Sequence, residues 1–149
     1  MKDNEIIELL TAEIMTALTA TELPGVARVL ESTDATDLIF RDVEGQLPAV
    51  GVADVSLEPE ENVGIGQKAW MGRVEWEITI AAPAVGETSA AGRDVIRTVL
   101  GEINSRLHNK TTSTRNRFKF LGFSYMDQPR LDAVVGVLRY RAGGVFGQE

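Results

Sequence analysis

The sequence predicts an α+β fold in which one mixed or antiparallel sheet carries two helices on one face and ends in a C-terminal β-hairpin. Three patterns indicate this fold. Apolar residues recur at spacings of three and four in two segments, as in amphipathic helices. Strict alternation over residues 73–82 is typical of a strand with one buried and one wet face. Two strand-like runs near the C-terminus flank a short turn, which predicts the hairpin.

The first third of the chain predicts a helix followed by strands. The helix is expected over residues 3–20, because one face of it would gather Ile6, Ile7, Leu10, Ile14 and Leu18. Pro24 and Gly25 end it. A β-branched run at residues 26–31 predicts a strand, and residues 34–41 are compatible with a second strand or a helical turn. Residues 47–55 form an apolar run typical of a strand covered on both faces.

The middle of the chain predicts a loop, the alternating strand and a second helix. Residues 58–67 are polar and rich in turn formers, which predicts an exposed loop. After the strand, Thr88 or Ser89 can cap a helix that runs to about Leu107. Its core-facing side chains are expected to be Val95, Ile96, Val99, Leu100, Ile103 and Leu107.

The last third predicts a basic loop at residues 108–117, and then the hairpin. Its strands are expected at residues 118–126 and 131–141, with the turn between them. Residues 142–149 are rich in glycine and predict a flexible tail. We see no repeat and no linker, so residues 1–149 are expected to form a single domain.

Composition narrows the range of functions. The chain has no cysteine, which excludes disulfides and thiolate chemistry. No apolar run approaches the roughly 20 residues of a membrane span, and the first residues are acidic where a secretory signal would be basic. We therefore expect a soluble protein made inside the cell, with no contact to a membrane.

The net charge of −7 is distributed unevenly. Residues 1–62 hold 14 acidic and 3 basic residues, whereas residues 63–149 hold 8 acidic and 12 basic residues. Such an asymmetry can arise by chance, or it can give a subunit two unlike surfaces that meet in neighbouring copies.

The motifs of catalysis and ligand binding fit poorly. His108 is the only histidine and has no acid or serine near it in sequence. The spacing Gly64-x-Gly66-x-x-Ala69 lacks the strand before it and the helix after it that a dinucleotide site needs. Glu75 and Glu77 share the wet strand face with Arg73, which indicates a mixed-charge sheet surface rather than an acid–base pair. We expect no enzymatic activity, no cofactor, no metal and no small-molecule substrate.

One basic stretch offers another interpretation. Residues 106–119 are the only concentrated basic stretch of the sequence, and four aromatic residues follow at once: Phe118, Phe120, Phe123 and Tyr125. Basic loops beside aromatic strands occur in modules that bind single-stranded nucleic acid. Alternation, however, would place two of these rings on each face of the strand, which favours a core or an interface over base stacking.

The order of these segments resembles the tail-terminator, or tail-completion, proteins of Mu-like contractile-tailed phages and prophages. The resemblance runs along nearly the whole chain. It is carried by the opening helix with its Leu23-Pro24-Gly25-Val26 turn, the apolar strand at 47–52, the polar loop, the strand at 74–82, the helix that starts near Gly92-Arg93-Asp94, and the closing hairpin.

This resemblance implies a structural role. Such proteins are thought to form rings, usually hexamers, that cap the tail tube and sheath, end polymerisation and present a surface to the head–tail connector. It implies a ring homo-oligomer, assembled in the host bacterial cytoplasm and retained in the virion tail. Alternatives are another head–tail connector or tail-tube subunit, a nucleic-acid-binding module that uses residues 106–119, or a small enzyme with scattered site residues.

A closing ring needs two unlike patches on each subunit. We therefore expect the acidic loop and the basic stretch to be exposed contacts with neighbouring subunits or tail partners. Trp70 is either the rim of the core or an assembly contact. The candidate contacts are Glu58, Glu60, Glu61, Trp70, Arg106, Lys110, Arg115, Arg117 and Lys119.

Overall fold

The computed structural model describes residues 3–31, 48–65, 69–83, 90–114, 116–126 and 133–147. Its helices are α1 (Asp3–Thr19) and α3 (Ala90–Leu107). Its strands are β1 (Arg28–Glu31), β2 (Ala49–Ile65), β3 (Ala69–Pro83), β4 (Lys119–Met126) and β5 (Ala133–Phe146).

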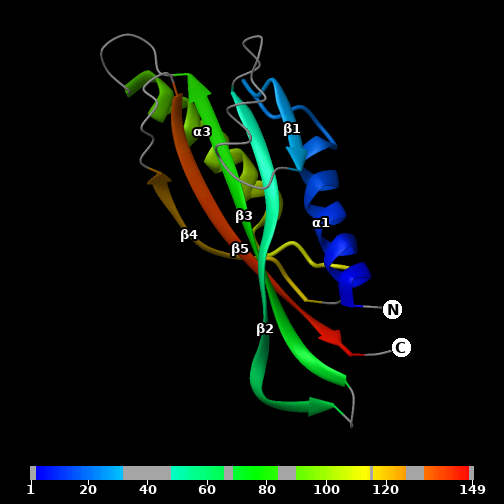
Figure 1. Ribbon diagram of the computed structural model, residues 1–149. Coiled ribbons are helices and arrows are strands. Elements are labelled where there is room, and N and C mark those ends of the chain that lie inside the picture. Colours follow the sequence, from blue (N-terminus) through cyan, green and yellow to red (C-terminus); the bar gives the residue numbers. More distant parts are fainter. Residues whose placement is uncertain are drawn as a thin grey trace.

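The strands form one five-stranded sheet in the order β1-β2-β3-β5-β4. β1 runs parallel to β2, and the other pairs are antiparallel, so the sheet is mixed. β4 and β5 are the C-terminal hairpin. In Figure 1, α3 lies behind the long, twisted sheet and α1 runs beside it, and the buried residues of both helices share one core with β3. The predicted α+β fold is therefore confirmed.

The core fills the space between the two helices and the sheet. The predicted apolar faces of both helices enter it, with Leu10 and Ile14 of α1 and Ile96 and Ile103 of α3 fully buried. From β3 the core receives Val74, Trp76, Ile78, Ile80 and Ala82, the set that alternation predicted. The predicted helices and the alternating strand are confirmed, because burial follows the sequence periods of 3.6 and 2.

The exposed loop predicted at residues 58–67 is wrong for residues 58–65, which belong to β2. This strand pairs with β3 beyond the point where proline and charged residues suggest that it ends: Pro59 lies opposite Gly72 and Gly64 opposite Trp70. Between these two pairs β2 has extra residues, so the register shifts. The turn-forming residues of this segment thus mark an irregularity within a long hairpin.

The alternation expected for the aromatic residues of β4 is also wrong. The register shifts between Phe120 and Gly122, where Gly122 has a φ of 152°. Such a β-bulge moves the following residues onto the other face. Phe123 and Tyr125 therefore join Phe120 on the side that packs against the core.

The flexible tail predicted from residue 142 is wrong for residues 142–146, which complete β5. Phe146 is fully buried and stacks on Trp70, with ring centroids 5.0 Å apart. Beyond the strand, the backbone N–H of Gly147 donates a hydrogen bond to Asp3 Oδ1 across 2.7 Å. Gly144 lies beside the core: a Cβ at this position would make ordinary contacts with Phe146 at 3.4 Å and with Ile6 at 3.7 Å.

Three expectations concern segments outside the described residues: the assignment of residues 34–41, the capping of the second helix by Thr88 or Ser89, and the hairpin turn at residues 127–130. Among the helices that the structure describes, none is long and apolar enough to cross a membrane.

Candidate assembly surface

One face of the sheet carries charged rows at its centre. It is the face turned away from the helices, and we call this part of it the open face. Glu75 and Glu77 of β3 lie directly opposite Arg141 and Arg139 of β5. Strand alternation explains the arrangement, since residues two apart on a strand point to the same side. Each row therefore carries two like charges, and the two rows are of opposite sign.

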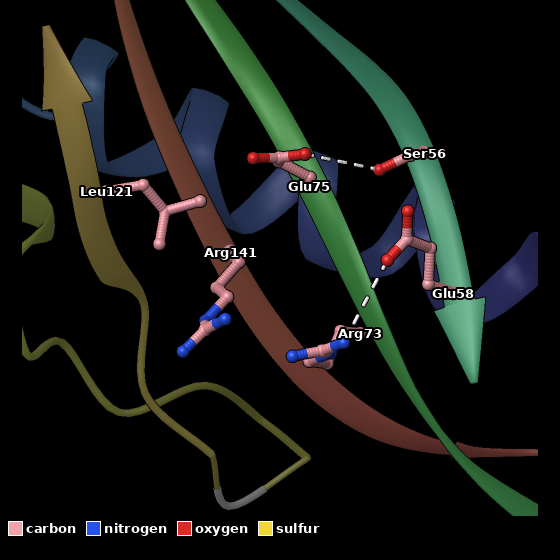
Figure 2. A pocket seen from close by; sticks show the side chains of 6 residues that line it. All are labelled: Ser56, Glu58, Arg73, Glu75, Leu121 and Arg141. Atoms are coloured by element: carbon pink, nitrogen blue, oxygen red, sulfur yellow. Dashed lines mark hydrogen bonds and ion pairs between the residues drawn. The ribbon is translucent and has the colours of Figure 1, made fainter. Parts of the chain in front are cut away.

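The two rows do not neutralise each other. Glu75 accepts a hydrogen bond from Ser56 Oγ across 3.4 Å, on the side away from Arg141. Figure 2 shows the Glu75 carboxylate turned towards β2 and the Arg141 guanidinium turned away from it. The side chains of Glu77, Arg139 and Arg141 make no hydrogen bond or ion pair with any residue that the structure describes.

A shallow hollow of about 130 Å³ lies beside these rows (Figure 2). It is lined by Ser56, Glu58, Arg73, Glu75, Leu121 and Arg141. Arg73 lies 3.9 Å from Glu58, and both side chains are well exposed, which makes this a loose surface pair. The hollow is too small for an ordinary substrate pocket, but a protruding side chain of a protein partner fits its size.

The predicted acidic contacts lie on β2. Glu58 is exposed and faces the open side of the sheet, opposite Arg73. Glu60 is half-buried. Glu61 belongs to the strand, and its side chain lies outside the described residues. Beyond Val52, none of the described residues pairs with β2 on its β1 side, so within the described part of the chain its acidic residues lie along an edge of the sheet.

Trp70 belongs to the rim of the core. It is half-buried, and its ring stacks on the buried ring of Phe146. Its position also explains Gly72, where a Cβ would come within 2.7 Å of the Trp70 ring and 2.6 Å of the Phe146 ring. The Trp70 ring therefore packs within the subunit, against Phe146 and over Gly72.

Arg106 is not the exposed contact that the sequence predicted, since only 14% of its side chain is accessible. It donates hydrogen bonds to the carbonyl oxygens of Leu18, Thr21 and Glu22, across 3.2, 2.7 and 3.2 Å. These carbonyls belong to the last turn of α1 and the residues after it, which lack helical donors. Arg106 therefore joins the end of α1 to α3.

The other basic candidates remain at the surface. Lys110, Arg117 and Lys119 are exposed, in the turn that leads into β4 and at the start of that strand. Arg115 lies outside the described residues. The turn is ordered by its polar residues: the backbone N–H of Ser113 donates to Glu13 of α1, and Thr112 is buried.

The aromatic residues beside this basic turn are not free to stack on bases. Phe118 is fully buried against Trp76, and Phe120 packs on Tyr140 with ring centroids 5.3 Å apart. Tyr125 lies beneath the guanidinium of Arg93, 4.2 Å from its ring centroid. These rings therefore pack in the core or against α3.

Sequence reasoning missed Arg139 and Arg141. The signal was present, because the two residues stand two apart in a strand-like run, as Glu75 and Glu77 do. Only the register between β3 and β5 places one pair beside the other. His108 lies exposed at the end of α3, and no group of three metal-ligating side chains occurs among the described residues.

No protein-family model matches the chain, and no curated protein matches it. The fold itself does occur in a known particle. A chain from a solved structure described as the virion of a native gene transfer agent particle aligns with a TM-score of 0.60 and 16% sequence identity. The alignment covers 92% of this chain and 95% of that one. The two chains therefore share a fold over nearly their full lengths.

Proposed function

We propose that this protein is a structural subunit of a phage-like particle and works by assembly rather than by catalysis. The observation that carries the proposal is the end-to-end likeness of its fold to a chain of a gene transfer agent virion. At 16% identity this likeness concerns the fold, so the role is inferred from where that fold is used. The surface supports the same inference, because only a small hollow lies beside its charged rows.

Within such a particle, the protein caps the tail tube as a hexameric ring, ends tail polymerisation and prepares the surface that joins the head. The order of its segments, which resembles the tail terminators of Mu-like phages, supports this finer role. Its partners are then further copies of itself, the tube and sheath proteins and the head–tail connector. The protein assembles in the bacterial cytoplasm and remains in the tail.

The two edges of the sheet support a closing ring. The β2 edge carries exposed acidic residues, Asp54 and Glu58, whereas the opposite edge, at β4, has exposed Lys110, Arg117 and Lys119 beside it. When such subunits stand side by side, the acidic edge of one meets the basic edge of the next. A contact between unlike patches repeats around a circle until it closes.

Charge reversal tests this contact. Lys110→Glu combined with Arg117→Glu should reduce the fraction of protein in rings, measured by light scattering and by negative-stain images. Arg97→Glu is the control, since Arg97 is exposed on α3, outside the basic turn, and pairs with Asp94 of its own helix. Circular dichroism would check that each variant folds. Rings that form equally well in all three proteins would refute the proposed contact.

A further inference from the structure

The open face holds charged groups whose best partners are not within the same subunit. Along each strand the like-charged residues are two positions apart, or about 7 Å, so they repel each other weakly. The opposite row is adjacent in register, yet no ion pair joins the rows within the described residues. Glu75, Glu77 and Arg141 are partly exposed and Arg139 is exposed, so a second surface can reach them.

The order of the two rows across the sheet determines how a second copy must be oriented for opposite charges to meet. The acidic row lies towards β2 and the basic row towards β4. A second copy that faces the first, related by a two-fold axis parallel to the strands, places its basic row over the acidic row and its acidic row over the basic one. A two-fold axis across the strands would place like charges together, which is costly at an interface.

The exposed apolar residues agree with this arrangement. Val55 and Leu121 are 46% and 36% exposed, and each lies at a bulge in an outer part of the sheet. Both bulges flank the paired residues Trp76 and Tyr140, so they lie at the same level along the strands. The two-fold axis that matches the charges therefore also places the bulge at Val55 of one copy at the level of the bulge at Leu121 of the other.

We propose that the open face binds a second copy of this chain through a two-fold contact in which Glu75 and Glu77 of each copy meet Arg139 and Arg141 of the other. A two-fold contact joins two copies and closes on itself, so it cannot build a ring. It is therefore separate from the edge contact, and it joins two subunits, or two rings, face to face.

Charge reversal with mixing tests the contact. Glu75→Arg/Glu77→Arg makes both rows basic, and Arg139→Glu/Arg141→Glu makes both rows acidic. Each variant alone should show a dissociation constant for face-to-face pairing at least about tenfold above that of the wild type in sedimentation at low salt. Mixed in equal amounts, the two variants should pair again, because opposite faces then meet.

The control is Glu8→Arg, an exposed position on α1 that should leave pairing unchanged. Pairing that persists in both charge variants, or that does not return on mixing, overturns the proposal. Either result would assign these charges to another partner or to solvent.

Cross-linking in the Lys110→Glu/Arg117→Glu background separates this contact from the ring contact. That background is needed because Val55 and Leu121 lie on β2 and β4, the strands whose edges meet in the proposed ring. The chain has no cysteine, so Val55→Cys/Leu121→Cys introduces the only two thiols. A bismaleimide that spans about 10 Å, the usual separation of packed sheets, should trap covalent dimers and no larger species. A ladder of three or more copies would indicate a head-to-tail contact at this face, and no cross-linked product would indicate no contact; both overturn the proposal while leaving the ring to be judged by its own images.

Discussion

Trp76 Nε1 donates a hydrogen bond to Thr11 Oγ1 across 2.9 Å, in the interior between β3 and α1. Thr11 Oγ1 in turn donates to the carbonyl oxygen of Ile7, one turn earlier in the helix, across 2.8 Å. The largest buried side chain thus has its one polar atom satisfied, and α1 is held in register against the central strand.

We expect Thr11→Val to lower the free energy of unfolding by about 1–3 kcal/mol, because the substitution leaves the indole N–H buried without an acceptor. Urea denaturation followed by tryptophan fluorescence measures the change. Thr19→Val is the matched control: Thr19 is exposed and bonds only to its own helix, at Met15. Equal losses in the two variants would show that the bond to Trp76 contributes nothing particular.

Arg106→Ala should destabilise the end of α1. The substitution removes the donors from the carbonyls of Leu18, Thr21 and Glu22, at an expected cost of about 2 kcal/mol. Hydrogen exchange should then accelerate in the last turn of α1 more than in α3. Arg106→Lys should recover only part of the loss, since an ammonium cannot reach several carbonyls as the guanidinium fork does. Full recovery by lysine would contradict the capping role.

Two glycines should respond to alanine in opposite ways. At Gly136 a Cβ would lie 2.6 Å from the Phe123 ring and 2.9 Å from Ile96, so Gly136→Ala should cost about 1–3 kcal/mol through overpacking. At Gly101, on the exposed side of α3, a Cβ would meet nothing within 4 Å. Gly101→Ala should therefore stabilise the protein by about 0.5–1 kcal/mol. Thermal unfolding of both variants checks the signs, and a shift in the same direction would refute the packing argument.

Stability should fall at high pH because of Tyr140. Burial raises the pKa of its hydroxyl above the ordinary value of 10.0, and the hydroxyl donates to Asn104 across 2.8 Å. Above pH 10 the unfolded chain releases this proton and the folded chain keeps it, so the free energy of unfolding decreases by up to about 1.4 kcal/mol per pH unit. Below pH 10 both states keep the proton, and the contribution is constant.

Tyr140→Phe should lose that part of the pH dependence. Denaturation of wild type and variant between pH 8 and pH 11 would compare the two slopes on a scale of about 1 kcal/mol per unit. The variant starts less stable at neutral pH, since Asn104 loses its donor, and the two proteins should converge as the pH rises. Parallel curves would contradict the assignment.

Much of the fold follows from local periodicity. The helical spacing of Leu10 and Ile14 and the alternation around Trp76 each specify a buried face without reference to the rest of the chain. Pairing between distant strands is different. Pro59 and the acidic residues near it have the composition of a loop, but the pairing with β3 holds them in a strand. The glycine-rich composition around Gly143 and Gly144 predicts a flexible tail. Both residues nevertheless lie in β5, because Phe146 is buried in the core.

The candidate surface, too, could be predicted only where local periodicity determines it, and not where it depends on pairing between distant strands. Alternation alone indicated that Glu75 and Glu77 lie on the wet face of their strand. That Arg139 and Arg141 stand opposite them depends on the register of two strands about 60 residues apart, which no local pattern encodes. For Arg106 the prediction was wrong in the other direction. Its place in a basic segment predicts an exposed charge, but because the end of α1 packs beside it, Arg106 donates hydrogen bonds to carbonyl oxygens there.

The mass and shape of the purified protein test the central claim, that this chain is a ring-forming structural subunit. Light scattering at low and high salt would be paired with negative-stain images of the largest species. The account predicts a discrete ring of hexamer size, alone or as two rings joined face to face. A solution that holds only monomers and dimers at every concentration and salt would contradict it.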